Sequence, residues 1–226
     1  MASKQDDQQQ LLELLLASGS LKFGAFQTKS GRSSPYFINT GAIASGQGMR
    51  QWCDFYADAI LKRWGAHSFS CLFGPAYKGI PLAVGTSMAL AAKGTNCDFA
   101  YNRKEAKEHG EGGSLVGRPL KKGDQVIVVE DVLTGGTSLR ETVKLLDPMG
   151  VKILGCVISV DREERGSGQT SARKEMESQL GIPIESLLTI TEVVDRLWNQ
   201  EVLGKVWVHD DQKLAIDRYR SIYGGS

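Results

Sequence analysis

The sequence predicts an α/β fold in which helices cover a parallel β-sheet on both faces. Four short apolar runs without strict alternation occupy residues 69–73, 97–101, 126–129 and 153–160. Helical patterns lie between them, at residues 80–93 and 138–147. Strands that are buried on both faces have this continuous apolar character, and strands that alternate with helices form parallel sheets. We therefore expect a doubly wound, twisted sheet with small additions at both ends of the chain.

The segment before the first run predicts a helix, a pair of strands and a second helix. Residues 5–18 carry leucines at positions 11, 12, 15 and 16 on one face and end at a glycine, which is typical of a helix. Residues 21–39 read as strands broken by a turn at 29–32. Residues 49–62 fit a helix whose apolar face is formed by Trp52, Phe55, Tyr56, Ala59 and Ile60.

The helix expected at 138–147 has recognisable end signals. Ser138 and Glu141 have the spacing of a capping box, and Pro148 and Gly150 follow the last turn. After about residue 166 the sequence predicts further helices, a short strand near 183–189 and an amphipathic tail. We expect the tail aromatics Trp198, Trp207 and Tyr219 to pack within the chain, although a subunit contact is the alternative.

Composition excludes several classes of protein. Lys and Arg total 27 and Asp and Glu total 26, so no charge excess favours nucleic acid or an anionic membrane. No secretion signal is apparent, and no apolar run approaches the roughly 20 residues of a membrane span. The four cysteines are scattered, which favours buried reduced thiols and a cytoplasmic location over disulfides or a zinc site. A length of 226 residues suits one domain, residues 1–226.

The segment 126–138 (VIVVEDVLTGGTS) has the features of a phosphate-binding loop. Glycines and a helix N-terminus present backbone N–H groups to an anion, and hydroxyls add further donors. The acidic pair Glu130 and Asp131 would repel phosphate, but it suits ribose hydroxyls or a magnesium ion. The segment lacks the Lys-Ser or Lys-Thr pair of a Walker A loop and the G-x-G-x-x-G spacing of a dinucleotide site. The alternative is an incidental strand–turn–helix.

This segment resembles the 5-phosphoribosyl 1-diphosphate (PRPP) motif of type I phosphoribosyltransferases, in which two acids precede a T-x-G-T loop. The resemblance implies that fold, and a Mg²⁺ ion that is held mainly through PRPP near Glu130 and Asp131. Glu130 and Gly135 depart from the usual motif. The implied PRPP contacts in this segment are Glu130, Asp131, Val132, Leu133, Thr134, Gly135, Gly136, Thr137 and Ser138.

Three more segments narrow the resemblance to orotate phosphoribosyltransferases. They are FGAFQTKSGRSSPYFIN (23–39), FGPAYKGIP (73–81) and AYNRKEAKEHGEGGSLVG (100–117). The resemblance implies transfer of the phosphoribosyl group from PRPP to orotate, giving orotidine 5′-monophosphate and diphosphate in de novo pyrimidine (UMP) biosynthesis. It also implies a Mg²⁺-dependent homodimer, an N-terminal hood at about 1–45 and a mobile lid loop at about 103–117.

Orotate is a flat ring with a carboxylate, so its pocket requires an apolar surface and a cation. Tyr36 and Phe37 can supply the surface and Lys29 a charge, although strand packing and a solvated turn are the simpler interpretations of each alone. The resemblance implies that Lys29 reaches both substrates, that Tyr36, Phe37 and Thr134 line the base pocket, and that Arg162 pairs with orotate. Arg162 follows the run 153–160, at the carboxyl end where ligands bind in such sheets.

Two further segments offer cations to the diphosphate of PRPP. Tyr77 and Lys78 follow the run 69–73 in a Gly-Pro turn, which on its own is equally consistent with a plain turn. The charged stretch after residue 102 reads either as a solvated loop or, given glycines at 110, 112 and 113, as a lid. The resemblance implies that Arg103, Lys107 and His109 reach the partner subunit's site while Lys104 serves its own. It places Lys107, His109 and Asp131 in catalysis.

Two alternative functions share part of this sequence pattern. A purine phosphoribosyltransferase would share the phosphate loop, but it predicts nothing about residues 29–37 or the long charged stretch. A regulator that senses PRPP while binding nucleic acid would need a basic face, and the balanced charge offers none.

Overall fold

The computed structural model describes residues 4–28, 31–104 and 114–225. Its centre is a six-stranded sheet in the order β5-β4-β3-β6-β7-β8. All neighbouring pairs are parallel except β4 and β5. The strands are β3 (Cys71–Gly74), β4 (Asp98–Asn102), β5 (Leu115–Gly117), β6 (Gln125–Leu133), β7 (Lys152–Asp161) and β8 (Ile184–Thr189). The expected parallel sheet is confirmed, with an antiparallel strand at one edge.

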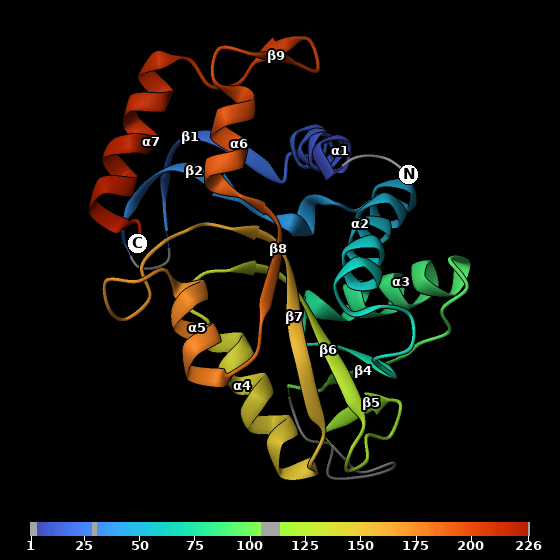
Figure 1. Cartoon of the computed structure of the whole chain (residues 1–226). Helices are drawn as coiled ribbons and strands as arrows, with labels where there is room; N and C mark the ends of the chain where they lie inside the picture. The colour runs from blue at the N-terminus through green and yellow to red at the C-terminus, as the bar shows by residue number, and fades with distance from the viewer. Residues whose placement is uncertain (1–3, 29–30, 105–113, 226) are drawn as a thin grey trace.

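Helices cover both faces of this sheet. Helices α2 (Gly46–Trp64) and α3 (Gly79–Ala92) pack on one face, and α4 (Thr137–Leu146) and α5 (Ala172–Leu180) pack on the other (Figure 1). The alternation along β6 divides the core accordingly. Ile127 and Val129 belong to the cluster with α2 and α3, whereas Val126 and Val128 belong to the cluster with α4 and α5. This is the doubly wound arrangement that the sequence predicts.

The N-terminal segment forms the expected helix and hairpin. Helix α1 (Lys4–Ala17) is followed by β1 (Leu21–Gln27) and β2 (Ser33–Ile38), which pair antiparallel as a separate sheet. A short 3-10 turn, η1 (Thr40–Ala42), leads from the hairpin into α2. The leucines on the inner face of α1 are buried in the same core as α2, so the hairpin and its helix are firmly attached to the sheet.

The C-terminal segment returns to the N-terminal hairpin. Helix α6 (Ile190–Leu197) is followed by the small β9–β10 hairpin (Glu201–Val202, Lys205–Val206) and by α7 (Asp210–Tyr223). Figure 1 shows α7 beside β1 and β2. The tail aromatics all make contacts within the chain: the indole N–H groups of Trp198 and Trp207 donate to Asp210 and to the Val202 carbonyl, and the Tyr219 hydroxyl donates to Glu164.

Two local expectations are wrong. Strand β6 continues to Leu133 because Glu130 and Val132 pair with Ile158 and Val160 of β7, so the acidic pair lies inside the strand and does not follow it. The capping box at Ser138 does not form. The N-cap of α4 is Gly136, which makes no side-chain cap, and the Ser138 hydroxyl donates instead to Glu130 Oε2 at 2.7 Å.

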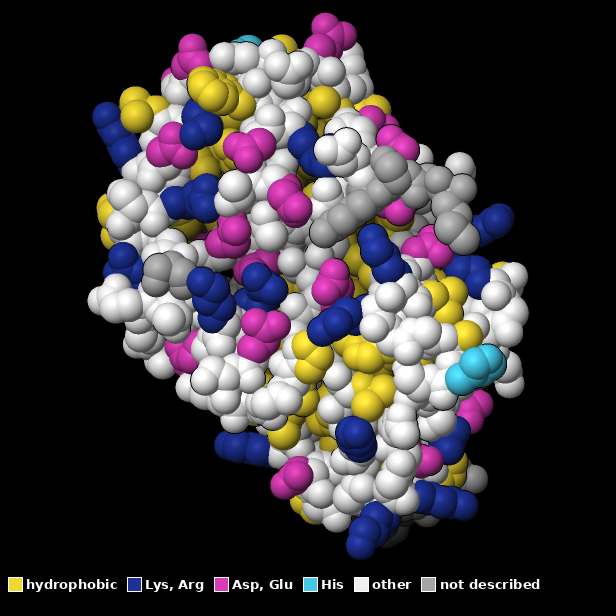
Figure 2. All heavy atoms as spheres, in the orientation of Figure 1, with side chains coloured by type: hydrophobic (Ala, Val, Ile, Leu, Met, Phe, Trp, Pro, Cys, Tyr) yellow, Lys and Arg dark blue, Asp and Glu magenta, His cyan; other side chains and the backbone are white. Residues whose placement is uncertain are grey.

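Among the described residues, no helix is long and apolar enough to cross a membrane. Basic and acidic side chains are interspersed on the face shown in Figure 2. All four cysteines are free and buried, as expected. Burial raises the pKa of Cys53 to about 11 and those of Cys71 and Cys97 to about 12, and it also raises the pKa of Cys156.

Candidate active site

The carboxyl ends of β3, β6 and β7 meet at one edge of the sheet, and most of the predicted site residues lie there. Ligands of open α/β sheets bind at this edge because the loops after neighbouring strands converge on it. Here the edge is completed by η1 from the N-terminal segment. Its centre is the acidic pair Glu130 and Asp131, near the end of β6.

Asp131 joins three segments that are distant in the sequence. Its carboxylate is largely buried, and Oδ2 accepts hydrogen bonds from Thr40 Oγ1 at 2.6 Å and from Lys78 Nζ at 2.9 Å. Thr40 comes from η1, and Lys78 comes from the turn between β3 and α3. An ammonium and a hydroxyl on one oxygen fix the orientation of the carboxylate.

Glu130 is held both by its backbone and by its side chain. The buried hydroxyl of Tyr56, on α2, donates to the Glu130 carbonyl at 2.7 Å. Ser138, at the start of α4, donates to the carboxylate. Burial raises the pKa of Glu130 to about 7, with a further contribution from the Asp131 charge, and the Ser138 hydrogen bond opposes the shift. The two acids thus differ in environment although they are adjacent.

The loop after β6 turns sharply into α4 and is open to solvent. Gly136 has φ +72°, and a Cβ atom built on it would lie 2.4 Å from Met176 Sδ. The turn therefore requires glycine at this position. Gly135 has no such neighbour. The exposed residues around the turn surround the N-terminus of α4, where unpaired N–H groups favour an anion: Thr134, Gly135, Thr137 and Ser138.

Arg140 holds the loop between β6 and α4 through two contacts. Its Nη1 donates to the Gly135 carbonyl at 2.7 Å, and its Nη2 forms an ion pair of 3.1 Å with Glu175 on α5. Arg140 is not among the sequence-predicted site residues. Its position one turn into α4 gave no signal, because the partner that makes it useful lies 35 residues later.

The turn between β3 and α3 carries the other predicted cations. Tyr77 is exposed, and Lys104 Nζ lies 5.3 Å from the centre of its ring. The Ala76–Tyr77 peptide bond is cis, and the Ala76 N–H donates to Asn102 Oδ1 at 2.9 Å. The Arg103 N–H donates to the Ser114 carbonyl at 2.8 Å, which joins two described residues of the predicted lid segment. Lys29, Lys107 and His109 lie outside the described residues.

The predicted base pocket is only partly assembled. Arg162 is largely buried, and its guanidinium lies 4.7 Å from the centre of the Tyr36 ring. Its Nε and Nη2 donate to Glu164 Oε1 at 2.8 and 2.5 Å. Successive residues of a strand point to opposite faces, so Phe37 faces away from Tyr36. Phe37 is 40% exposed, and its ring stacks on that of Phe26 with centroids 5.5 Å apart. The structure therefore brings Tyr36 and Arg162 together and does not bring Phe37 to them.

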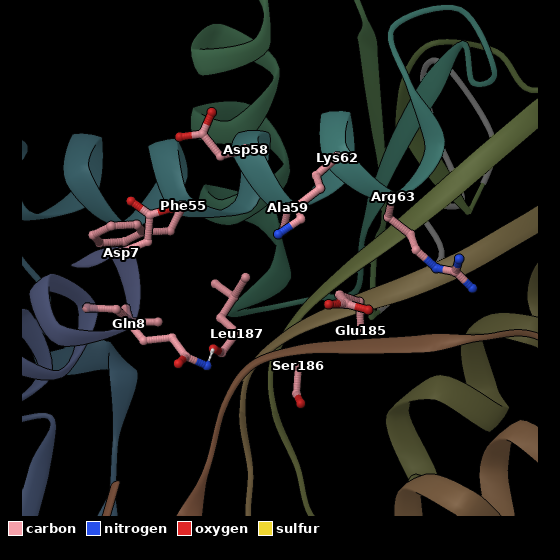
Figure 3. A pocket seen from close by; sticks show the side chains of 11 residues that line it. Asp7, Gln8, Phe55, Asp58, Ala59, Lys62, Arg63, Glu185, Ser186 and Leu187 are labelled. Atoms are coloured by element: carbon pink, nitrogen blue, oxygen red, sulfur yellow. Dashed lines mark hydrogen bonds between the residues drawn. The ribbon is translucent and has the colours of Figure 1, made fainter. Parts of the chain in front are cut away.

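A separate pocket of about 280 Å³ lies between α1, α2 and β8 (Figure 3). Phe55 and Leu187 provide apolar walls, and Gln8 donates to the Leu187 carbonyl across its floor at 3.2 Å. None of the residues that line it is a predicted site residue. The pocket and the acidic edge are therefore distinct features of the molecule.

Comparison with known proteins places the chain in a family. The family model described as "Phosphoribosyl transferase domain" matches residues 39–179. An orotate phosphoribosyltransferase of Lachnoclostridium phytofermentans is 45% identical over 217 residues, which cover 95% of this chain and 96% of the relative. One from Neisseria meningitidis serogroup C is 46% identical over 200 residues, covering 88% and 92%.

Solved structures agree with the sequence relatives. The crystal structure of an orotate phosphoribosyltransferase from Francisella tularensis superposes with a TM-score of 0.81 at 32% identity, covering 96% of this chain and all of that one. An adenine phosphoribosyltransferase of Saccharomyces cerevisiae superposes with a TM-score of 0.54 at 14% identity, which shows the shared fold alone.

Proposed function

The chain belongs to the orotate phosphoribosyltransferase family, and from that premise we propose how its residues carry out the reaction. The enzyme transfers the 5-phosphoribosyl group from PRPP to orotate, giving orotidine 5′-monophosphate and diphosphate in pyrimidine biosynthesis. The observation that carries the residue assignment is the order of groups along β6 and α4: two carboxylates, a left-handed glycine turn, then a helix N-terminus.

The 5-phosphate of PRPP binds at the turn into α4 in this proposal. The exposed loop and the helix N-terminus supply backbone N–H groups, and Thr134, Thr137 and Ser138 supply hydroxyls. Val132 and Leu133 contribute through their backbone, since the Leu133 side chain is buried in the core. Arg140 keeps Gly135 in place from the other side of the loop.

The acidic pair faces the ribose. Displacement at the anomeric carbon passes through an oxocarbenium-like transition state, and the carboxylates favour the positive charge that develops on the ring. Lys78 and Lys104, with Tyr77 beside them, balance the charge on the departing diphosphate. Lys107 and His109 add to them from the partner subunit, and Arg103 belongs to the same lid.

The donor set fits a magnesium ion that is held mainly by the substrate. Among the described residues no three His, Cys, Asp or Glu side chains form a cluster that could hold a metal ion. The protein oxygen ligands in this proposal are therefore the two carboxylates of Glu130 and Asp131. Mg²⁺ is typically bound by one or two carboxylates together with substrate phosphates and water. When bound, the ion would neutralise negative charge on the diphosphate.

Arg162 binds the carboxylate of orotate, and its guanidinium packs over the ring of Tyr36. Thr134 and Lys29 complete the base pocket in the proposal, whereas Phe37 lies on the opposite face of β2 from Tyr36 and packs on Phe26. Arg162 is supported by its place at the carboxyl end of β7, by its burial and by its position over Tyr36.

The assembly and location also belong to the proposal. The enzyme acts as a cytoplasmic homodimer in which the lid at about 103–117 closes over the site of the partner. One domain spans 1–226, and the α1–hairpin segment at about 1–45 forms a hood over the base pocket. The free, buried thiols support a reducing compartment.

Ultraviolet absorbance tests the assignment directly. Purified enzyme with orotate, PRPP and Mg²⁺ should show loss of the orotate band, and Asp131→Asn should slow this loss strongly while the protein stays folded. Adenine or hypoxanthine in place of orotate serves as the control. Consumption of a purine, or full activity in the Asp131→Asn variant, would contradict the assignment.

A further inference from the structure

The C-terminal helix is tied to both segments that form the proposed base pocket. Gln212 Nε2, on α7, donates to the Pro35 carbonyl in β2 at 2.6 Å. At the other end of the helix, the Gly225 N–H donates to the Glu163 carbonyl at 2.9 Å, in the loop that carries Arg162. The helix therefore spans the two segments (Figure 1).

Between these two attachments, Tyr219 of α7 reaches the ion pair of Arg162. The Tyr219 hydroxyl donates to Glu164 Oε1 at 2.8 Å, and the same oxygen accepts both hydrogen bonds from Arg162. The Tyr219 ring is 5% exposed and packs edge-on against Tyr36, with centroids 5.8 Å apart. Tyr219, Glu164, Arg162 and Tyr36 thus form one largely buried cluster.

The arrangement has two physical consequences for Arg162. Glu164 Oε1 also accepts from the Tyr36 hydroxyl, at the longer distance of 3.5 Å. A carboxylate that is fixed by the close Tyr219 hydroxyl as well can hold the guanidinium in one rotamer. A phenol that shares the Glu164 charge also weakens the competition between Glu164 and a substrate carboxylate for the guanidinium. Both effects favour binding of an anionic base by Arg162.

We propose that Tyr219 is a positioning residue for orotate, which acts through Glu164 to orient Arg162. The inference rests on the proposed role of Arg162 in binding orotate. It assigns the C-terminal helix a part in substrate recognition, although the helix lies outside the residues that match the family model.

The test is Tyr219→Phe in the full-length enzyme, which removes one hydroxyl and keeps the ring. We expect the KM for orotate to rise about tenfold, with kcat and the KM for PRPP within about twofold of the parent. Tyr223→Phe is the matched control, because Tyr223 lies one turn later on the same helix and its hydroxyl makes no hydrogen bond in the described structure. It should leave all three constants unchanged.

The Glu164→Ala variant tests whether Tyr219 changes the KM for orotate through Glu164. Glu164→Ala alone should raise the KM for orotate by a similar factor, and it provides the test by itself if Tyr219→Phe does not fold. Adding Tyr219→Phe to Glu164→Ala should cause no further change. Additive effects, or a fall in kcat and a rise in both KM values together, would overturn the proposal.

Arg162→Ala separates this inference from the assignment beneath it. An unchanged KM for orotate in Arg162→Ala would remove the role of Arg162, and the proposal would fall with it. A large rise in Arg162→Ala with no change in Tyr219→Phe would overturn the role of Tyr219 alone.

Discussion

The hydroxyl of Thr40 donates a hydrogen bond of 2.6 Å to Oδ2 of Asp131, and both residues are largely buried. This contact joins the turn after the N-terminal hairpin to the strand that carries the acidic pair. Lys78 shares the same oxygen. The orientation of Asp131 thus depends on residues from two other segments, so it can be disturbed without touching the acid itself.

Thr40→Val should lower kcat by about tenfold, or ~1.4 kcal/mol, because Asp131 loses the donor that orients it while Lys78 remains. Thr40→Ser keeps the hydroxyl and should stay within about twofold of the parent. Steady-state kinetics with saturating orotate and PRPP measure both. Equal losses in the two variants would show that the methyl packing of Thr40 matters and the hydrogen bond does not.

The raised pKa of Glu130 predicts a pH-dependent stability. A carboxyl whose pKa is about 7 in the folded protein keeps its proton after the unfolded chain has ionised near pH 4.5, so its ionisation disfavours folding. The contribution is fully favourable below about pH 4.5 and is lost as pH rises through about 7. Relative to the parent, Glu130→Gln should therefore gain stability from pH 5 to pH 8, as measured by urea denaturation.

Ser138→Ala tests the same carboxyl from the opposite direction. The Ser138 hydroxyl donates to the ionised form and holds the pKa down, so its removal should raise the pKa of Glu130 further. The pH at which the Glu130 contribution is lost should move upward. Urea denaturation at a series of pH values measures this shift. If the pH midpoint of the stability loss is the same in Ser138→Ala as in the parent, another group titrates in this range.

The turn into α4 should tolerate alanine at only one of its two glycines. Gly136→Ala adds a Cβ at positive φ and close to the Met176 sulfur, and it should cost about 2–4 kcal/mol of stability. Gly135→Ala is the matched control, with no atom within 4 Å of the added carbon, and should stay within about 0.5 kcal/mol. Chemical denaturation of both variants checks this, and similar losses would contradict the local geometry.

The proposed shared lid predicts complementation between inactive variants. Lys107→Ala should lower turnover much more than PRPP affinity, since its charge acts on the departing diphosphate. When this variant is mixed with Asp131→Asn and the subunits exchange, half of the dimers are hybrids with one complete site. Activity should then recover to about a quarter of the parent. Activity no greater than the mean of the two variants alone would rule out a site shared between subunits.

The sequence predicted what local pattern determines. The order of strands and helices, the buried leucines of α1 and the glycine turn after β6 all follow from periodicity and backbone chemistry. The predicted end of β6 is wrong: two acids interrupt the apolar run, but pairing with β7 continues the strand past them. The capping box failed because Ser138 has a stronger partner in the Glu130 carboxylate than in its own helix.

Other features of the site could not be read from local pattern. Thr40, Tyr56 and Tyr219 make their decisive contacts with residues 91, 74 and 55 positions away. Such pairs depend on how distant elements pack, which neither helical nor strand periodicity encodes. The sequence around each of the three residues is typical of core or of a turn, so it does not indicate a role in the site.

The burial of every cysteine has a practical use. A thiol reacts with maleimides through its thiolate, and the four native thiols are both shielded and protonated at neutral pH. A cysteine introduced at an exposed position would then be the preferred attachment point for a dye, with no need to remove the native four. Ser114 is exposed and lies within the lid proposed at about 103–117, so Ser114→Cys would place a fluorophore where the proposed closure over PRPP can be timed in solution.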